Sequence, residues 1–210
     1  MNLPTMPPNR PRSLILGSTS IYRRELLSRL RVPFDVVSPE VDETPQPGEV
    51  PRALAERLAL AKANAVADKF AKSVVIGSDQ VADLNGESLG KPGSHPNAVL
   101  QLRLMRGQTV WFHTAVAVVC KEAGFEQHDV VTTKVRFREF SDDEIENYLE
   151  LEKPYDCAGS AKSEGLGISM LDSIESGDPT ALIGLPLIKT CQMIRQAGVV
   201  LLAKSAEAPA

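Results

Sequence analysis

The chain has 210 residues, 43% of them hydrophobic and 5% aromatic, which is enough for one domain or two closely joined lobes with an aliphatic core. Its net charge of −4 argues against a general nucleic-acid-binding protein, because such proteins normally carry a basic surplus. No apolar run approaches the ~20 residues that span a membrane, and residues 1–12 lack the apolar segment of a secretory signal. The widely spaced Cys120, Cys157 and Cys191 are interpreted as buried, reduced thiols of a cytoplasmic protein.

The first half of the chain predicts short strands that alternate with helices. Ser20 is a candidate N-cap, because its hydroxyl can satisfy an unpaired amide of the helix that follows. Pro51 can open a long helix at its first position, and Asn85-Gly86 predicts a hairpin because both residues accept positive φ. The expected elements are a strand at 13–16, a helix from about 21 that ends at Pro33, a strand at 34–38, a helix from 51 to about 70, and strands at 73–76, 81–84 and 87–89.

The second half continues in mixed order rather than as strict βαβ units. Ser141 and Glu144 form a capping-box pattern at the start of a helix. The expected elements are a helix at 97–106, strands at 109–120 and 130–137, a helix from 141 to 151, a helix at about 187–197, and a short apolar strand after Gly198. We therefore expect an α/β protein with a mixed sheet, a single domain at 13–202, and flexible tails at 1–12 and 203–210.

Five short polar segments lie where such a chain would end a strand or begin a helix. They offer hydroxyls, cations and carboxylates, while His95, His113 and His128 lack the paired spacing of a metal site. This inventory suits a phosphate ester that is held by cations, with or without a divalent metal, and attacked by water. The segments are 17–24, 39–44, 77–80, 90–92 and 157–165.

Each segment also has a plainer interpretation. Segment 17–24 joins a strand to a helix start, which favours an anion, and Ser18 and Arg23 add donors; the alternative is a capped helix with solvated arginines. Asp79 is expected at the end of a strand, where a carboxylate is either catalytic or simply caps a turn. Lys62 falls beside the apolar face of its helix, so it either lays its stem along the core or points its ammonium into a cleft.

Lys91 lies in a segment, 86–92, that does not match a phosphate-binding P-loop. The spacing is one residue short, proline replaces Ser or Thr, and the segment follows a hairpin. On a rigid turn, Lys91 can still meet a phosphate as a point charge.

Taken together, these residues resemble the Maf-like nucleotide pyrophosphatases. The matching motifs occur in the family's order over roughly 13–200, and they are Ser-Thr-Ser-Ile-Tyr-Arg (18–23), Pro-Glu-Val-Asp-Glu (39–43), Lys62-Ala63, Ile-Gly-Ser-Asp-Gln (76–80), Gly-Lys-Pro (90–92) and Gly-Leu-Pro-Leu (184–187). The chain is most similar to the branch that hydrolyses 7-methyl-GTP. The pointers are Tyr22, Gln80 and the segment 154–165; one departure is Tyr22 itself, where that branch often has tryptophan.

The resemblance implies a Maf/ITPase-like architecture with two lobes around a deep substrate cleft, often in a homodimer, and a divalent cation (Mg, Mn or Co). By matching position, Asp79 would be the general base. The groups that would hold the triphosphate are Ser18, Arg23, Lys62 and Lys91. Glu40 resembles a family carboxylate near the metal and, together with Asp79, would be its ligand.

The resemblance also implies how the base is selected, with Tyr22, Gln80 and Glu164 as the specificity residues. N7-methylation makes guanine positively charged, so Tyr22 would stack on it and Glu164 would accept hydrogen bonds from its N1–H and amino group. The alternative for Glu164 is a surface acid in a Gly-rich loop. The expected partner is a small nucleotide, and neither nucleic acid nor a membrane.

Two other functions remain open at this point. One is a pyrophosphatase of the same family that acts on dTTP or UTP. The other is a nucleotide-binding regulator of cell division, without catalysis, although Asp79 beside the full set of cations argues against it.

Overall fold

The computed structural model describes residues 12–202. Apart from Arg12, the residues expected to form the tails lie outside the described residues. Within them, no helix is both long and apolar enough to cross a membrane.

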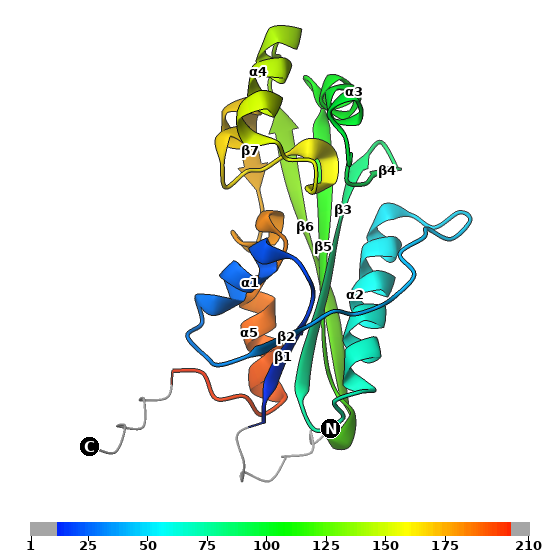
Figure 1. Cartoon of the computed structure of the whole chain (residues 1–210), viewed down its shortest axis with the longest axis vertical. Coiled ribbons are helices and arrows are strands. Elements are labelled where there is room, and N and C mark those ends of the chain that lie inside the picture. Colours follow the sequence, from blue (N-terminus) through cyan, green and yellow to red (C-terminus); the bar gives the residue numbers. More distant parts are fainter. Residues whose placement is uncertain (1–11, 203–210) are drawn as a thin grey trace.

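In the described residues, a single mixed sheet of seven strands forms the framework (Figure 1). The strand order is β2-β1-β3-β5-β6-β7, and β4 pairs with β3 on the same edge as β1 but further along the strand. β1 runs parallel to β2 and β3, whereas the other pairs are antiparallel, so the predicted α/β class with a mixed sheet is confirmed. The strands are β1 Leu14–Gly17, β2 Asp35–Val37, β3 Val74–Leu84, β4 Glu87–Leu89, β5 Thr109–Cys120, β6 Phe125–Phe137 and β7 Leu171–Glu175.

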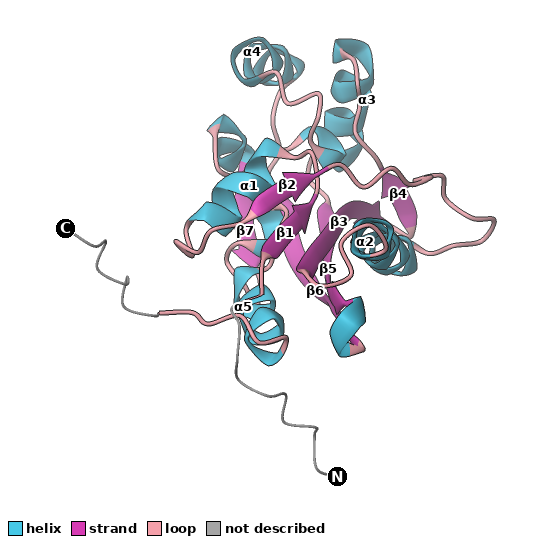
Figure 2. Ribbon diagram, turned by 60° about the horizontal axis from the view of Figure 1, so that its bottom comes forward, coloured by secondary structure: helices cyan, strands magenta, loops and turns pink. Residues whose placement is uncertain are grey.

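Five α-helices occur in the described part of the chain, and they cover both faces of this sheet (Figure 2). α2 lies along one face, while α1 and α5 lie on the other face near β1 and β2, and α3 and α4 lie at the far end of the sheet (Figure 1). The predicted caps are confirmed, because the Ser20 hydroxyl accepts a hydrogen bond from the Arg23 amide and Ser141 forms a capping box with Glu144. The helices are α1 Ile21–Ser28, α2 Pro51–Ala67, α3 His95–Met105, α4 Asp142–Glu152 and α5 Leu187–Gln196.

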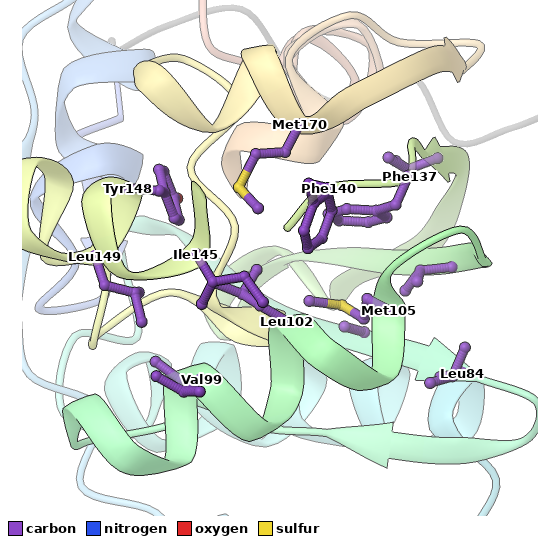
Figure 3. Packing of buried hydrophobic residues seen from close by; sticks show 14 of the residues in the cluster. Leu84, Val99, Leu102, Met105, Phe137, Phe140, Ile145, Tyr148, Leu149 and Met170 are labelled. Carbon is purple, nitrogen blue, oxygen red and sulfur yellow. The ribbon is translucent and has the colours of Figure 1, made fainter. Parts of the chain in front are cut away.

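The alternation of side chains along the strands divides the core. On one face of β1, β3 and β5, apolar residues pack against α2; on the other face, the intervening residues pack against α1 and α5. A third apolar cluster joins α3 and α4 to the far halves of β3, β5 and β6 (Figure 3). The α1/α5 cluster and the α3/α4 cluster share one face of the sheet but remain separate, which gives the expected two lobes.

The structure differs from three of the expected elements and contains one strand that was not predicted. β3 is one continuous strand of eleven residues that includes segment 77–80, so Asp79 lies within a strand and does not begin a turn. β6 starts at Phe125 rather than 130. β7 was not predicted, and residues 199–202 do not form a strand.

Candidate active site

A polar cleft of about 530 Å³ opens beside β3, between the end of β1 and the end of β4. β1 pairs with β3 only as far as Gly77, and β4 pairs with it only from Ala82 onward. The intervening part of β3 therefore has an open edge, although it lies in the middle of a strand. The cleft receives residues from 18–23, from 38–43, from α2, from Lys91, and from the loops at 156–164 and 182–184.

The centre of the cleft holds a lysine between two carboxylates. Lys62 Nζ lies 2.6 Å from Asp79 Oδ1 and 2.7 Å from Glu43 Oε1. Lys62 is only 5% exposed and Asp79 only 7% exposed. Lys62 lines the cleft, whereas Asp79 lies behind it. Of the two interpretations of Lys62, the structure therefore shows the ammonium that is directed into a cleft.

Glu43 belongs to this centre although the sequence analysis did not select it. It lies in the acidic segment 39–44, but the spacing of the acids there does not reveal which one turns inward. Burial would raise the pKa of Glu43, yet Lys62, Lys91 and Arg23 outweigh this effect and the pKa is lowered. Glu43 is thus an anion in a cationic setting.

Arg23 and Ser18 lie together at the start of α1, as the polar segment predicted. Arg23 Nε donates to the carbonyl of Gly184 at 2.9 Å, and its Nη1 donates to the Ser18 hydroxyl at 3.4 Å. Burial lowers the pKa of Arg23, while Asp79 and Glu43 raise it in opposition. The guanidinium is therefore fixed in position beside the helix N-terminus, where anions are favoured.

Lys91 enters the cleft from the turn after β4. Its side chain is exposed, and among residues 12–202 no ion pair or hydrogen bond occupies its ammonium. The turn itself is fixed, since the Gly90 carbonyl accepts from the Gly159 amide at 3.3 Å and the Gly93 amide donates to the Tyr155 carbonyl at 3.0 Å. A free cation on a fixed turn is suited to an incoming phosphate.

A second group of residues in the cleft, called the base end, combines an aromatic ring with acids. Tyr22 donates a hydrogen bond to Asp156 Oδ1 at 3.4 Å, and Glu164 lines the same end. Burial and then Cys157 raise the pKa of Tyr22, and burial raises the pKa of Glu164 although Lys162 opposes it. Burial also raises the pKa of Cys157 to about 12, so this thiol is not a nucleophile at neutral pH.

Gln80 links the sheet to the loop that closes the cleft. Its Nε2 lies 2.9 Å from Thr114 Oγ1, 3.0 Å from the Ala181 carbonyl and 2.9 Å from the Leu182 carbonyl. Because the amide nitrogen faces these acceptors, its Oε1 is left without a hydrogen bond from the described residues. Gln80 lines the cleft, so it offers an acceptor there while it holds loop 181–184 in place.

Glu40 lines the mouth of the cleft but does not join the central group. Its side chain is 82% exposed and lies 3.6 Å from Lys69 Nζ. No ion pair connects it to the centre formed by Lys62, Asp79 and Glu43 within residues 12–202. In the same part of the chain, no three His, Cys, Asp or Glu side chains form a group that could hold a metal by themselves.

The cleft thus holds two chemically distinct groups of residues, called the phosphate end and the base end. One end gathers three cations around a buried carboxylate, Asp79, and an exposed one, Glu43, an arrangement that can bind a polyphosphate and hold a water molecule. The other end gathers a tyrosine ring and two acids, which suit a flat, positively charged group.

Most of the chain is similar in sequence to known proteins. A protein from Polaromonas sp. (strain JS666), named "7-methyl-GTP pyrophosphatase", is 68% identical over 203 residues, which cover 97% of this chain and 92% of that protein. Proteins of the same name from Albidiferax ferrireducens and Burkholderia thailandensis are 65% and 58% identical, covering 90% and 88% of this chain and 94% and 87% of their own lengths. The model of the family described as "Maf-like protein" matches residues 13–197, and the chain belongs to this family.

Proposed function

We propose that the protein is a nucleoside triphosphate pyrophosphatase that hydrolyses 7-methyl-GTP to 7-methyl-GMP and pyrophosphate. The observation that carries this proposal is that one cleft contains both Lys62, which contacts Asp79 and Glu43, and the pair Tyr22 and Glu164. The names of the relatives, at 58–68% identity over most of the chain, support the same substrate.

The cations bind the triphosphate in this proposal. Cleavage between the α- and β-phosphates develops charge on the transferred group and on the departing pyrophosphate, so fixed cations lower the barrier. An ammonium has three N–H donors; two of those on Lys62 face Asp79 and Glu43, and the third remains for a phosphate oxygen. Arg23, Ser18 and Lys91 complete the phosphate end.

Asp79 is the proposed general base. It is fixed by Lys62 on a strand rather than on a loop, so its carboxylate is held rigidly behind the phosphate end. From there it orients a water molecule toward the α-phosphorus and accepts its proton.

The residues present suit a divalent cation of the Mg or Mn type. Such a cation is usually held by one or two carboxylates together with substrate phosphates and water, so a closed protein cage is not needed. Asp79 and Glu43 are the carboxylates nearest the phosphate end, and Glu40 at the mouth is the third candidate. When bound, the cation would neutralise charge on the phosphates.

The base end selects the methylated purine. The tyrosine ring offers its face to the positively charged guanine, and the Glu164 carboxylate accepts hydrogen bonds from the N1–H and amino group. A cation–π contact is worth on the order of 1–2 kcal/mol when desolvated, which corresponds to roughly five- to thirtyfold in selectivity.

A panel of triphosphates tests the proposal. Purified protein with Mg²⁺ or Mn²⁺ is assayed for pyrophosphate release from 7-methyl-GTP, GTP, dTTP and UTP. We expect the highest kcat/KM for 7-methyl-GTP. Equal or faster turnover of dTTP or UTP would refute 7-methylguanine as the preferred nucleobase but would still support pyrophosphate release from a nucleoside triphosphate.

Two further properties belong to the proposal. A reducing compartment, the cytoplasm, fits the three free cysteines Cys120, Cys157 and Cys191. The protein is predicted to form a homodimer, which light scattering of the purified protein checks. Its predicted partner is a small nucleotide, and neither nucleic acid nor a membrane.

A further inference from the structure

A lysine lies over the ring that we propose to stack on the substrate. Lys162 Nζ is 5.7 Å from the centroid of the Tyr22 ring, which is within the range of a cation–π contact. A positively charged side chain thus already interacts with the aromatic group proposed to recognise a positively charged base. The two positive charges would repel each other across this ring.

Glu152 of α4 holds this lysine in place. Lys162 Nζ donates to Glu152 Oε1 at 2.6 Å, and Glu152 Oε2 accepts from the Leu166 amide at 2.7 Å. At the other end of the segment, the Lys162 amide donates to the Tyr148 hydroxyl at 3.1 Å. The pair therefore ties both ends of segment 162–166 to α4, and Glu164 lies between them.

The pair also acts on one of the two acids of the base end, since Lys162 lowers and Glu152 raises the pKa of Glu164. Asp156 and Glu164 line the cleft, and neither forms an ion pair within residues 12–202. Lys162 and Glu152 are only about a quarter and a sixth exposed, so solvent screens them incompletely. As long as both are present, their charges nearly cancel and the acids determine the local potential.

We propose that the Lys162–Glu152 ion pair sets how strongly the cleft prefers a positively charged base over a neutral one. The inference rests on the proposed function and deepens it, since it assigns selectivity to two residues that need not touch the substrate. Loss of the lysine leaves an additional negative charge that attracts the methylated base. Loss of the glutamate leaves an unbalanced positive charge that repels it.

Charge variants test this inference through one ratio, kcat/KM for 7-methyl-GTP divided by kcat/KM for GTP. We expect Lys162→Gln to raise the ratio and Glu152→Gln to lower it, each by roughly two- to fivefold, the range of a partly screened charge pair. The double variant should return the ratio to that of the unaltered protein. Lys162→Arg, which keeps the charge, should leave it unchanged. The differences should shrink as salt is raised.

The decisive outcome is that the ratio rises in one single variant and falls in the other. If the ion pair only held segment 162–166 in place, both variants would change the ratio in the same direction. The inference would be overturned if the ratio changed in the same direction in both single variants or stayed constant in both. It would also be overturned if the differences between the variants did not depend on salt. Failure of the proposed function looks different: the unaltered protein itself would then show no preference for 7-methyl-GTP.

Discussion

Gly17 of β1 and Gly77 of β3 are partners in the parallel register of these strands, and both lie under α2. A Cβ at Gly77 would lie 2.5 Å from the amide nitrogen of Ala63 and 2.9 Å from its Cβ. A Cβ at Gly17 would lie 3.3 Å from the Lys62 carbonyl oxygen. The two missing side chains therefore let α2 approach the sheet closely enough for Lys62 to reach Asp79.

We expect Gly77→Ala to damage the active site as well as the fold. The added methyl group must push α2 away from β3, which costs on the order of 1–3 kcal/mol of the free energy of unfolding. The displaced Lys62 should lose its contact with Asp79, so kcat should fall by more than the stability change explains. Urea unfolding and steady-state kinetics measure the two effects.

Gly177→Ala is the matched control, because a Cβ there meets nothing within 4 Å and the backbone does not need positive φ. It should leave both quantities nearly unchanged. A Gly77→Ala protein with normal stability and activity would contradict the close-approach argument.

Asp79→Asn should separate catalysis from binding. Asparagine keeps the shape of the side chain but cannot accept a proton, so kcat should fall by roughly 10²–10⁴-fold. The remaining cations should still hold the nucleotide, so the affinity measured by calorimetry should change much less. Asp83→Asn, on the same strand and face but bound to His113, is the control and should retain its kcat.

A regulator without catalytic activity would behave differently from this enzyme. The unaltered protein would then release no pyrophosphate, and Asp79→Asn would have no turnover to lose. That result would overturn the proposed role of Asp79 and leave only nucleotide binding.

Local sequence signals predicted most helices and strands because caps, prolines and hairpin residues act over a few positions. They divided β3 into two strands, 73–76 and 81–84, since Gly77-Ser78 resembles a turn; here the glycine allows the close approach of α2 instead. β7 was missed because Leu171–Glu175 has polar residues and packs as an edge strand without a buried face. The continuity of β3 and the presence of β7 both depend on contacts between segments far apart in the sequence, which local patterns do not show.

The same limit applies to the site. The sequence did not decide whether Lys62 lays its stem along the core or directs its ammonium into a cleft. A position beside the apolar face of a helix does not show whether a carboxylate lies near the ammonium. The acidic segment drew attention to Glu40, whereas Glu43 is the residue that contacts Lys62. Only the path of the loop after β2 decides between two acids three residues apart.

Glu49 should make stability depend on pH through its pair with Arg57. Arg57 Nε and Nη2 lie 2.6 and 2.8 Å from the two carboxylate oxygens, and the Gln46 amide also donates to Glu49. These hydrogen bonds to Arg57 and Gln46 lower the pKa of Glu49 to about 2. The pair also fixes the loop that carries Glu43, because Arg57 donates to the Thr44 carbonyl.

A lowered pKa in the folded state stabilises the protein fully above the ordinary pKa, about 4.5, and this contribution fades as the pH falls toward 2. Glu49→Gln should therefore unfold at lower urea concentration than the unaltered protein at pH 7. The gap should narrow between about pH 4.5 and pH 2. A gap that stays constant over that range would show that the charge of Glu49 is not responsible.

Tyr22 should determine selectivity through its ring rather than its hydroxyl. Tyr22→Phe keeps the aromatic face and loses only the 3.4 Å hydrogen bond to Asp156, so the preference for 7-methyl-GTP over GTP should change less than about twofold. Tyr22→Leu removes the face that attracts the positive charge. Its preference should fall by roughly five- to thirtyfold, the equivalent of about 1–2 kcal/mol.

The ratio of kcat/KM values for the two substrates is the measurement, because the phosphate end is common to both and cancels. Turnover of GTP itself should therefore differ much less among the three proteins. If Tyr22→Leu kept the preference, the tyrosine would serve only as packing beneath Lys162. Selectivity would then have to come from the carboxylates, and Glu164→Gln would be the variant that abolishes it.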